Sequence, residues 1–254
     1  MRNLFRSWFT KVSRAPRLAL EHEPFVSARE LCRVVHGHDI YEAFPHESYR
    51  SDMQGWNSKS AVFGRLMREI RPHRVVELGT WKGASALHMC DLARDLGLSP
   101  FMIVCVDTWL GGMWHWQERL PADTHDSLAW RHGYPQVYFQ FLANVIKAGH
   151  ADRVVPLPNT TDFGAEFFQS IGFRDVDLLY IDAAHTFEAV YADIRNWWPL
   201  VRSGGTVFGD DFTSYYPGVE QAVRRFCQEH DLTFETDREK WIIRKPRPIG
   251  HGFE

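Results

Sequence analysis

The sequence of 254 residues has few cysteines, no long hydrophobic run and no excess of charge of either sign. Its four cysteines, Cys32, Cys90, Cys105 and Cys227, form no CxxC pair and have no metal-ligand spacing, so we expect reduced, buried thiols in a cytoplasmic protein. No apolar run approaches the roughly 20 residues that span a bilayer. With 29 Lys and Arg against 32 Asp and Glu, the formal charge of −3 favours no nucleic-acid partner.

Linkers, low-complexity tracts and internal repeats are also missing, so we expect a single domain over residues 58–254. Residues 1–57 are expected to form an N-terminal helical segment. Its start, MRNLFRSWFTKVSRAPRLAL, is basic with apolar residues at helical spacing. This pattern is consistent with a helix on a membrane surface or a partner, with an organelle transit peptide, and with a helix packed on the domain or on a second copy in a homo-oligomer.

Apolar segments of strand length alternate with helical patterns over the rest of the chain. Strands are predicted at 74–79, 101–107, 153–158, 176–182 and 204–211, with a closing pair at 232–237 and 240–245. Helices are predicted at 58–71, with Ser58 as N-cap, and at 83–97, 135–149, 161–171, 187–202 and 217–230. Near-continuous apolar strands separated by helices indicate a parallel sheet covered on both faces. We therefore predict a doubly wound, three-layer α/β sandwich with an antiparallel closing strand.

Acidic residues follow two of these strands. Asp182 ends the segment LLYID, and the pair Asp210 and Asp211 ends GGTVFGDD. The segment between them is long enough for a helical crossover, so both strand ends would meet at the carboxyl edge of the sheet, where α/β proteins bind ligands. Three carboxylates there suit a hard divalent cation. The alternative for the Asp210–Asp211 pair is a turn or a helix N-cap.

The turn VELGTWKGAS after the first strand contains GxxxG, whereas a dinucleotide site requires GxGxxG. Gly79 and Gly83 allow close approach of a ligand to the backbone, and the following helix offers free N–H groups. The missing glycine argues against a pyrophosphate. Asp107, at the end of the second strand, is placed to accept hydrogen bonds from ribose hydroxyls, which indicates an adenosine-type ligand. The alternative is that Glu77 and Asp107 only cap neighbouring helices.

The segments ELGTWKGAS, VDTW and IDAAHTFEAVYADI…WWPLVRSGGTVFGDD together resemble the class I S-adenosylmethionine-dependent methyltransferases. More narrowly, they are similar to the metal-dependent O-methyltransferases of catechols, macrolide sugars and rhamnosyl groups, over about residues 55–245. The resemblance implies S-adenosyl-L-methionine as cofactor, with Asp107 on the ribose and Thr160 or Thr161 near the adenine. The implied cofactor-binding residues are Glu77, Gly79, Thr80, Gly83, Ser85, Asp107, Thr160 and Asp182.

The same resemblance implies a divalent cation, Mg²⁺, held by Asp182, Asp210 and Asp211. A cation in contact with an acceptor hydroxyl lowers its pKa and fixes its position, as in-line methyl transfer requires. Two adjacent hydroxyls could chelate that cation. The expected acceptor is therefore a vicinal diol or a catechol on a small molecule or glycan.

His185 follows Asp182 by three residues, the spacing at which the catechol enzymes have a lysine base; a D-x-x-H pattern also occurs among relatives. Some sugar O-methyltransferases use an Asp two residues after the ligand, but Ala184 is found there. A histidine with a pKa near neutrality can take a hydroxyl proton, so we predict His185 as the catalytic base. A histidine with only a structural hydrogen bond is the alternative.

Residues 109–134 form a long insertion rich in Trp and His, and loops of this length usually have a function. Trp114, His115 and Trp116, together with Tyr215, are predicted to line the acceptor pocket. A lid or a dimer contact is the alternative for the insertion.

The sequence thus predicts a metal-assisted O-methyltransferase. A metal-independent methyltransferase and a non-catalytic cofactor-binding module are the alternatives. A nucleic-acid methyltransferase is disfavoured, because neither a basic groove nor an NPPY-type motif is found.

Overall fold

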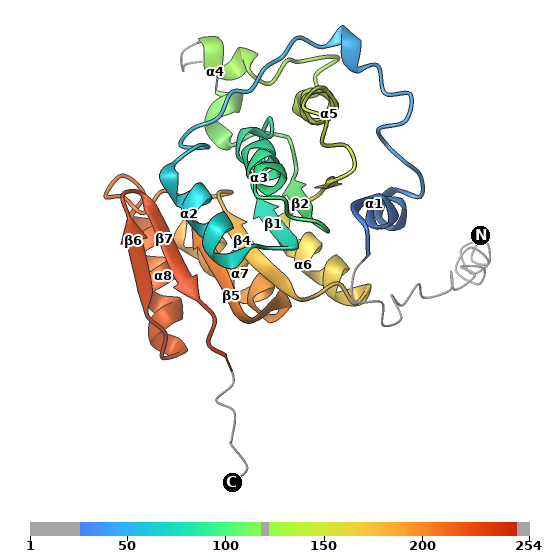
Figure 1. Cartoon of the computed structure of the whole chain (residues 1–254). Coiled ribbons are helices and arrows are strands. Elements are labelled where there is room, and N and C mark those ends of the chain that lie inside the picture. The colour runs from blue at the N-terminus through green and yellow to red at the C-terminus, as the bar shows by residue number, and fades with distance from the viewer. Residues whose placement is uncertain (1–25, 118–121, 248–254) are drawn as a thin grey trace, which may run out of the picture.

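The computed structural model describes residues 26–117 and 122–247 (Figure 1), so the basic start of the chain, up to residue 25, lies outside the described residues. Within them, one sheet contains β1 (Arg74–Leu78), β2 (Met102–Asp107), β3 (Val154–Pro158), β4 (Val176–Ile181), β5 (Val201–Gly209), β6 (Phe234–Asp237) and β7 (Lys240–Arg244). The order is β3-β2-β1-β4-β5-β7-β6, with β1 to β5 parallel and β7 antiparallel to both neighbours. The predicted doubly wound α/β fold is confirmed.

Helices cover both faces of this sheet (Figure 1). They are α1 (Ala28–His36), α2 (Ala61–Ile70), α3 (Ala84–Asp95), α4 (Ala122–Asp126), α5 (Val137–Lys147), α6 (Thr161–Ser170), α7 (Phe187–Trp197) and α8 (Pro217–Glu229), with 3₁₀ turns η1 (His46–Ser48), η2 (Met113–Trp116) and η3 (Trp198–Leu200). The domain boundary at residue 58 stays a prediction. Residues of α1 pack in the same core layer as β1 and β4.

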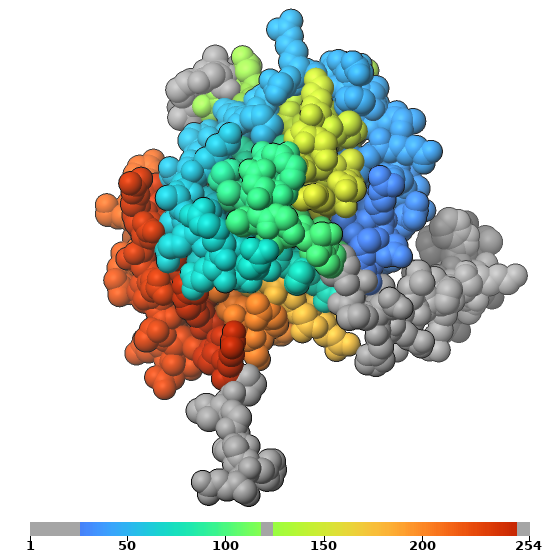
Figure 2. Space-filling model, viewed as in Figure 1, coloured from blue at the N-terminus to red at the C-terminus, as the bar shows by residue number. Residues whose placement is uncertain are grey.

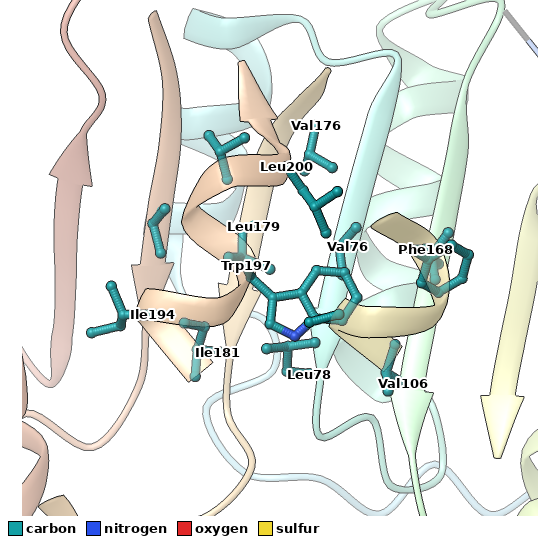
Figure 3. Packing of buried hydrophobic residues seen from close by; sticks show 14 of the residues in the cluster. Val76, Leu78, Val106, Phe168, Val176, Leu179, Ile181, Ile194, Trp197 and Leu200 are labelled. Atoms are coloured by element: carbon teal, nitrogen blue, oxygen red, sulfur yellow. The ribbon is translucent and has the colours of Figure 1, made fainter. Parts of the chain in front are cut away.

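The period of two along each strand divides the core into two layers. On β1, Val76 and Leu78 face the layer of α1, α6, α7 and α8, whereas Val75 faces the layer of α2, α3 and α5. In the first layer the Trp197 indole lies among side chains of β1, β4 and α6 (Figure 3), and its Nε1 donates to the Thr161 carbonyl at 3.0 Å. Figure 2 shows the face of the molecule that the second layer forms, with α2, α3 and α5 side by side.

Two predicted helix boundaries are wrong. Helix α2 begins after Ser60, not Ser58, because the Ser58 hydroxyl instead donates to the Trp56 carbonyl at 3.1 Å. Helix α7 ends at Trp197, since Pro199 has no N–H to continue it. The strand predicted at 204–211 begins earlier, at Val201, and its register with β4 shifts between Val201 and Thr206.

All four cysteines are buried and free, as predicted. No helix in residues 26–117 or 122–247 combines the length and the apolar character required to cross a bilayer.

Asp193 on α7 is buried between α7 and α6, and burial raises its pKa to about 7 despite a hydrogen bond from the Thr161 side chain. The folded chain therefore keeps a proton that the unfolded chain, with a pKa near ~3.9, has lost. We expect the free energy of unfolding to decrease between about pH 4 and 7, by at most about 1.4 kcal/mol per pH unit from this group. Urea denaturation across this range should show a flatter pH dependence for Asp193→Asn. If the free energy of unfolding changed equally with pH in wild type and Asp193→Asn, groups other than Asp193 would cause the change.

Candidate functional site at the carboxyl edge of the sheet

The candidate site lies where the strand order reverses between β1 and β4. Gly79 follows β1 with φ +81°, and Asp182 follows β4. A Cβ on Gly79 would lie 2.0 Å from the Asp182 carbonyl oxygen, and the Asp182 N–H donates to the Leu78 carbonyl at 2.8 Å. The glycine turn and the first acidic residue are thus in direct contact. In open α/β sheets, such a switch point is the position of the ligand crevice.

Asp107 at the end of β2 fixes the glycine turn. Its Oδ2 accepts the N–H groups of Thr80 and Trp81, both at 2.8 Å, and its Oδ1 accepts the Trp109 N–H at 2.7 Å. Burial raises the Asp107 pKa, although these backbone donors oppose the shift. The carboxylate therefore orients the backbone of the turn.

The side chains beneath the turn are buried. Glu77 is fully buried and accepts a hydrogen bond from the Ser85 hydroxyl; burial raises its pKa to about 8, against the effect of Ser85. The Thr80 Oγ1 is buried without a hydrogen-bond partner in the described part of the chain. A buried hydroxyl of this kind normally has a partner, so a polar ligand at the turn fits. Thr160 is exposed and caps α6, accepting from the Phe163 N–H at 3.3 Å.

The segment before α2, around residues 52–54, contacts this turn, which the sequence did not indicate. The Lys82 ammonium, buried behind Trp81, lies 2.6 Å from Asp52 Oδ2 and 3.0 Å from Gln54 Oε1. Asn144 of α5 donates to the carbonyls of Asp52 and Lys82 at 2.7 and 2.9 Å. The chain that leads from η1 to α2 is thereby tied to the turn.

Asp182, His185 and Asp211 form a cluster in which one ligand atom from each lies within 4.8 Å of the others. His185 Nε2 is 2.8 Å from Asp211 Oδ2. The three side chains, together with Asp210, line a small pocket whose wall also includes Ala184, Val219 and Trp241. Two carboxylates and an imidazole are donors that fit a divalent cation.

Asp210 lines the same pocket, but its carboxylate pairs with a lysine. Its Oδ2 pairs with the ammonium of Lys240, and its Oδ1 accepts the Asp211 N–H at 2.9 Å. Asp211, which follows β5, has φ +61°, a left-handed backbone conformation. The structure therefore brings all three predicted metal ligands to one pocket, with Asp182, Asp211 and His185 in one cluster and Asp210 paired with Lys240.

The crowded charges shift the pKa values in the cluster. Burial lowers the His185 pKa, but the hydrogen bond and charge of Asp211, with the charges of Asp182 and Asp210, raise it overall. Burial and the Asp210 charge raise the pKa of Asp182, partly offset by Lys240. Compensating positive charge would relieve both shifts.

Aromatic rings hold His185 from two sides. Trp114 stacks on it, with ring centroids 6.0 Å apart, and Tyr216 lies at 4.3 Å. Trp114 is 42% exposed and Tyr215, packed edge-on against Tyr216, is 80% exposed. The other two predicted pocket residues make contacts within the insertion or with the turn. His115 is buried against Trp81 at 4.6 Å, and Trp116 packs on Trp130 at 4.6 Å.

Two further side chains of the site, Tyr180 and Lys240, are not indicated by the sequence. The Tyr180 hydroxyl donates to Asp182 Oδ2 at 2.8 Å, and Lys240 Nζ lies 2.8 Å from the same hydroxyl. Tyr180 and Asp182 are two residues apart, so the period of two could have placed them on one face. No local pattern places Lys240, which reaches the site through the pairing of β7 with β5.

A mostly parallel sheet with this switch point, a glycine turn after β1 and acidic residues after β4 and β5 define a Rossmann-like α/β domain with a ligand crevice at its carboxyl edge. Residues 76–212 match the model of the family described as "Methyltransferase domain", and the chain belongs to that family. The predicted class, an S-adenosylmethionine-dependent methyltransferase, is thereby confirmed.

Three solved methyltransferases share the fold. CalS11, a calicheamicin methyltransferase, has a TM-score of 0.52 and 17% identity, covering 72% of this chain and 76% of its own. The O-methyltransferase NovP has a TM-score of 0.51 and 18% identity, and the match covers 87% of this chain and 98% of NovP. An O-methyltransferase from Bacillus cereus has a TM-score of 0.50 and 16% identity, and the match covers 89% of this chain and 94% of that enzyme.

A sequence relative, the uncharacterized protein y4gI of Sinorhizobium fredii, is 30% identical over 148 residues, or 58% of this chain. The chain spans only 14% of the length of that relative.

Proposed function

We propose that this domain is a divalent-cation-assisted O-methyltransferase that methylates one hydroxyl of a vicinal diol or catechol on a small molecule or glycan. The proposal rests on one observation above all: Asp182 and Asp211, from two separate strands, meet beside His185 and next to the Gly79 turn. CalS11, which shares the fold, is a TDP-rhamnose 3'-O-methyltransferase, and a sugar acceptor is compatible with the proposal.

The residues around the glycine turn would hold the cofactor. S-Adenosylmethionine supplies a methyl group on a positively charged sulfur. Gly79, Thr80 and Gly83 would contact it through the backbone and the unpartnered Thr80 hydroxyl. Asp107 would accept from the ribose, while Glu77 and Ser85 support the turn from below. Thr160 at the start of α6 is the proposed neighbour of the adenine.

Asp182 and Asp211 would hold the cation, Mg²⁺ or Mn²⁺. A divalent cation supplies Lewis acidity, which lowers the pKa of an acceptor hydroxyl and fixes its position. The Tyr180 hydroxyl donates to Oδ2 of Asp182. Within residues 26–117 and 122–247, Oδ2 is the carboxylate oxygen of Asp182 that accepts a hydrogen bond. Oδ1 is therefore the free oxygen for a ligand.

His185 would remove the acceptor proton. Once the charges of Asp182 and Asp211 are compensated, the cause of the raised His185 pKa is removed, and a neutral imidazole becomes available. An oxygen lone pair then forms the new C–O bond as the C–S bond breaks, the bonding pair stays on sulfur, and the proton goes to His185. Trp114 and Tyr216 keep the ring in place, and Trp114 and Tyr215 offer aromatic surface to the acceptor.

A metal-independent methyltransferase is the second candidate, because Lys240 already compensates the charge of Asp210. Chelation separates the two. We expect exhaustive EDTA treatment to abolish methyl transfer from labelled S-adenosylmethionine to a catechol and to a nucleotide-linked rhamnose. Binding of S-adenosylhomocysteine, followed by calorimetry, should be largely retained, since the glycine turn contacts Asp182 through backbone atoms that chelation leaves unchanged.

Restoration of transfer by added Mg²⁺ or Mn²⁺ is the control for damage by the chelator. Full turnover after chelation would remove the cation from the proposal. Cofactor binding without transfer to any diol, at any cation concentration, would favour a non-catalytic binding module.

A further inference from the structure

The aspartate pair is divided between two environments by a buried lysine. The side chain of Lys240 is 2% exposed and that of Asp210 is 4% exposed, and the two form an ion pair. The Lys240 ammonium lies over the rings of Phe63 and Tyr180, 5.1 and 4.9 Å from their centroids. A charged pair enclosed by aromatic rings is stable only while both partners are present.

Both carboxylate oxygens of Asp210 accept hydrogen bonds from the protein. Oδ2 is bound by Lys240 and lies 3.4 Å from the Tyr180 hydroxyl, and Oδ1 accepts the Asp211 N–H. The backbone carbonyl of Asp210 also accepts the Trp241 indole N–H, at 3.2 Å. Asp210 is thus fixed in place by side chains of β4 and β7 and by the N–H of Asp211, which follows β5.

Lys240 also sets the direction of the Tyr180 hydroxyl. A phenol has a single proton, and the ammonium of Lys240, at 2.8 Å, can only donate to it. The Tyr180 proton is therefore directed to Asp182 Oδ2, also at 2.8 Å. The same lysine neutralises one aspartate and orients a second.

We propose that Lys240 is the permanent counter-ion of Asp210, so that the cation site consists of Asp182 and Asp211, with His185 beside them, and excludes Asp210. This inference rests on the proposed function, because it assumes that the domain binds a divalent cation. The Lys240–Asp210 pair then contributes no net charge to the site.

A charge-neutral double variant of the full chain tests this inference, with Mn²⁺ as the probe and its affinity measured by electron paramagnetic resonance. Lys240→Met with Asp210→Asn removes the pair but leaves the net charge unchanged, and we expect the Mn²⁺ affinity to stay within about threefold of wild type. Asp211→Asn, the matched control, removes one carboxylate from the cluster and should weaken binding by at least about tenfold.

The single variant Lys240→Met gives a second readout. It leaves Asp210 buried and unpaired, so the melting temperature should decrease. Mn²⁺ should raise the melting temperature of this variant more than that of wild type, because Asp210 then lacks any other positive partner. The double variant should lose this extra response.

The outcomes separate the two proposals. If wild type binds Mn²⁺ and the double variant loses affinity as Asp211→Asn does, Asp210 is a ligand and the inference is wrong, while the proposed function stands. If wild type binds no Mn²⁺, both are wrong. Should the double variant not fold, crystals of the unmodified chain grown with Mn²⁺ decide: an ion bonded to Asp182 and Asp211 alone supports the inference, and an Asp210–Mn²⁺ bond overturns it.

Discussion

Replacing His185 with alanine is expected to lower kcat by about 10²- to 10⁴-fold, the usual contribution of a general base. The imidazole is the group beside Asp182 and Asp211 that can accept a proton near neutral pH once their charges are compensated. The wild-type rate should increase with pH as His185 loses its proton, and the variant should lose that increase. Initial rates with labelled S-adenosylmethionine, measured from about pH 6, near the ordinary histidine pKa, to about pH 9, report both effects.

Two controls distinguish a base from a ligand or a structural histidine. Added imidazole should restore part of the activity of His185→Ala, because it can replace a missing base. The Mn²⁺ affinity of the variant should stay close to that of wild type. Loss of Mn²⁺ binding would make His185 a ligand, and a rate close to wild type without rescue by imidazole would leave it a hydrogen-bonded partner of Asp211.

The fold could be predicted because its signals are local. The apolar runs of β1, β2 and β4 are buried on both faces, and the helices between them are too long for hairpin turns. The boundaries that failed depend on contacts beyond the local pattern. Ser58 and Ser60 are both residue types that favour an N-cap, but in the structure the Ser58 hydroxyl donates to the Trp56 carbonyl and the Ser60 side chain makes no cap hydrogen bond. The shift inside β5 depends on its pairing with β4.

From the sequence, the site could be predicted only as far as the strand ends at which its residues lie. Parallel strands place Asp182 and the Asp210–Asp211 pair at one edge whatever their side chains contact. The direction of each carboxylate depends on the left-handed backbone at Asp211 and on Lys240, which is 30 residues away in the sequence. Likewise, nothing in the insertion indicates that Trp114 stacks on His185 while Trp116 packs on Trp130.

Substituting alanine for Gly79 is expected to have the largest effect on stability of the changes considered. The new Cβ would lie 2.0 Å from the Asp182 carbonyl oxygen and 2.6 Å from the Ala183 Cα, and both are backbone atoms that no side-chain rotation can move. The loops after β1 and β4 would have to separate. We expect a loss of about 4 kcal/mol or more in urea denaturation, at the upper end for a single substitution, and weaker binding of S-adenosylhomocysteine in any folded fraction.

Gly149→Ala is the matched control, because Gly149 has a similar φ of +75° but no atom within 4 Å of the added Cβ. It measures the cost of the left-handed conformation alone, about 1–2 kcal/mol. The difference between the two variants therefore reports the contact between the glycine turn and Asp182. If both variants were destabilised equally, these two loops would not touch, and the cofactor turn and the acidic cluster would no longer have to share one cleft.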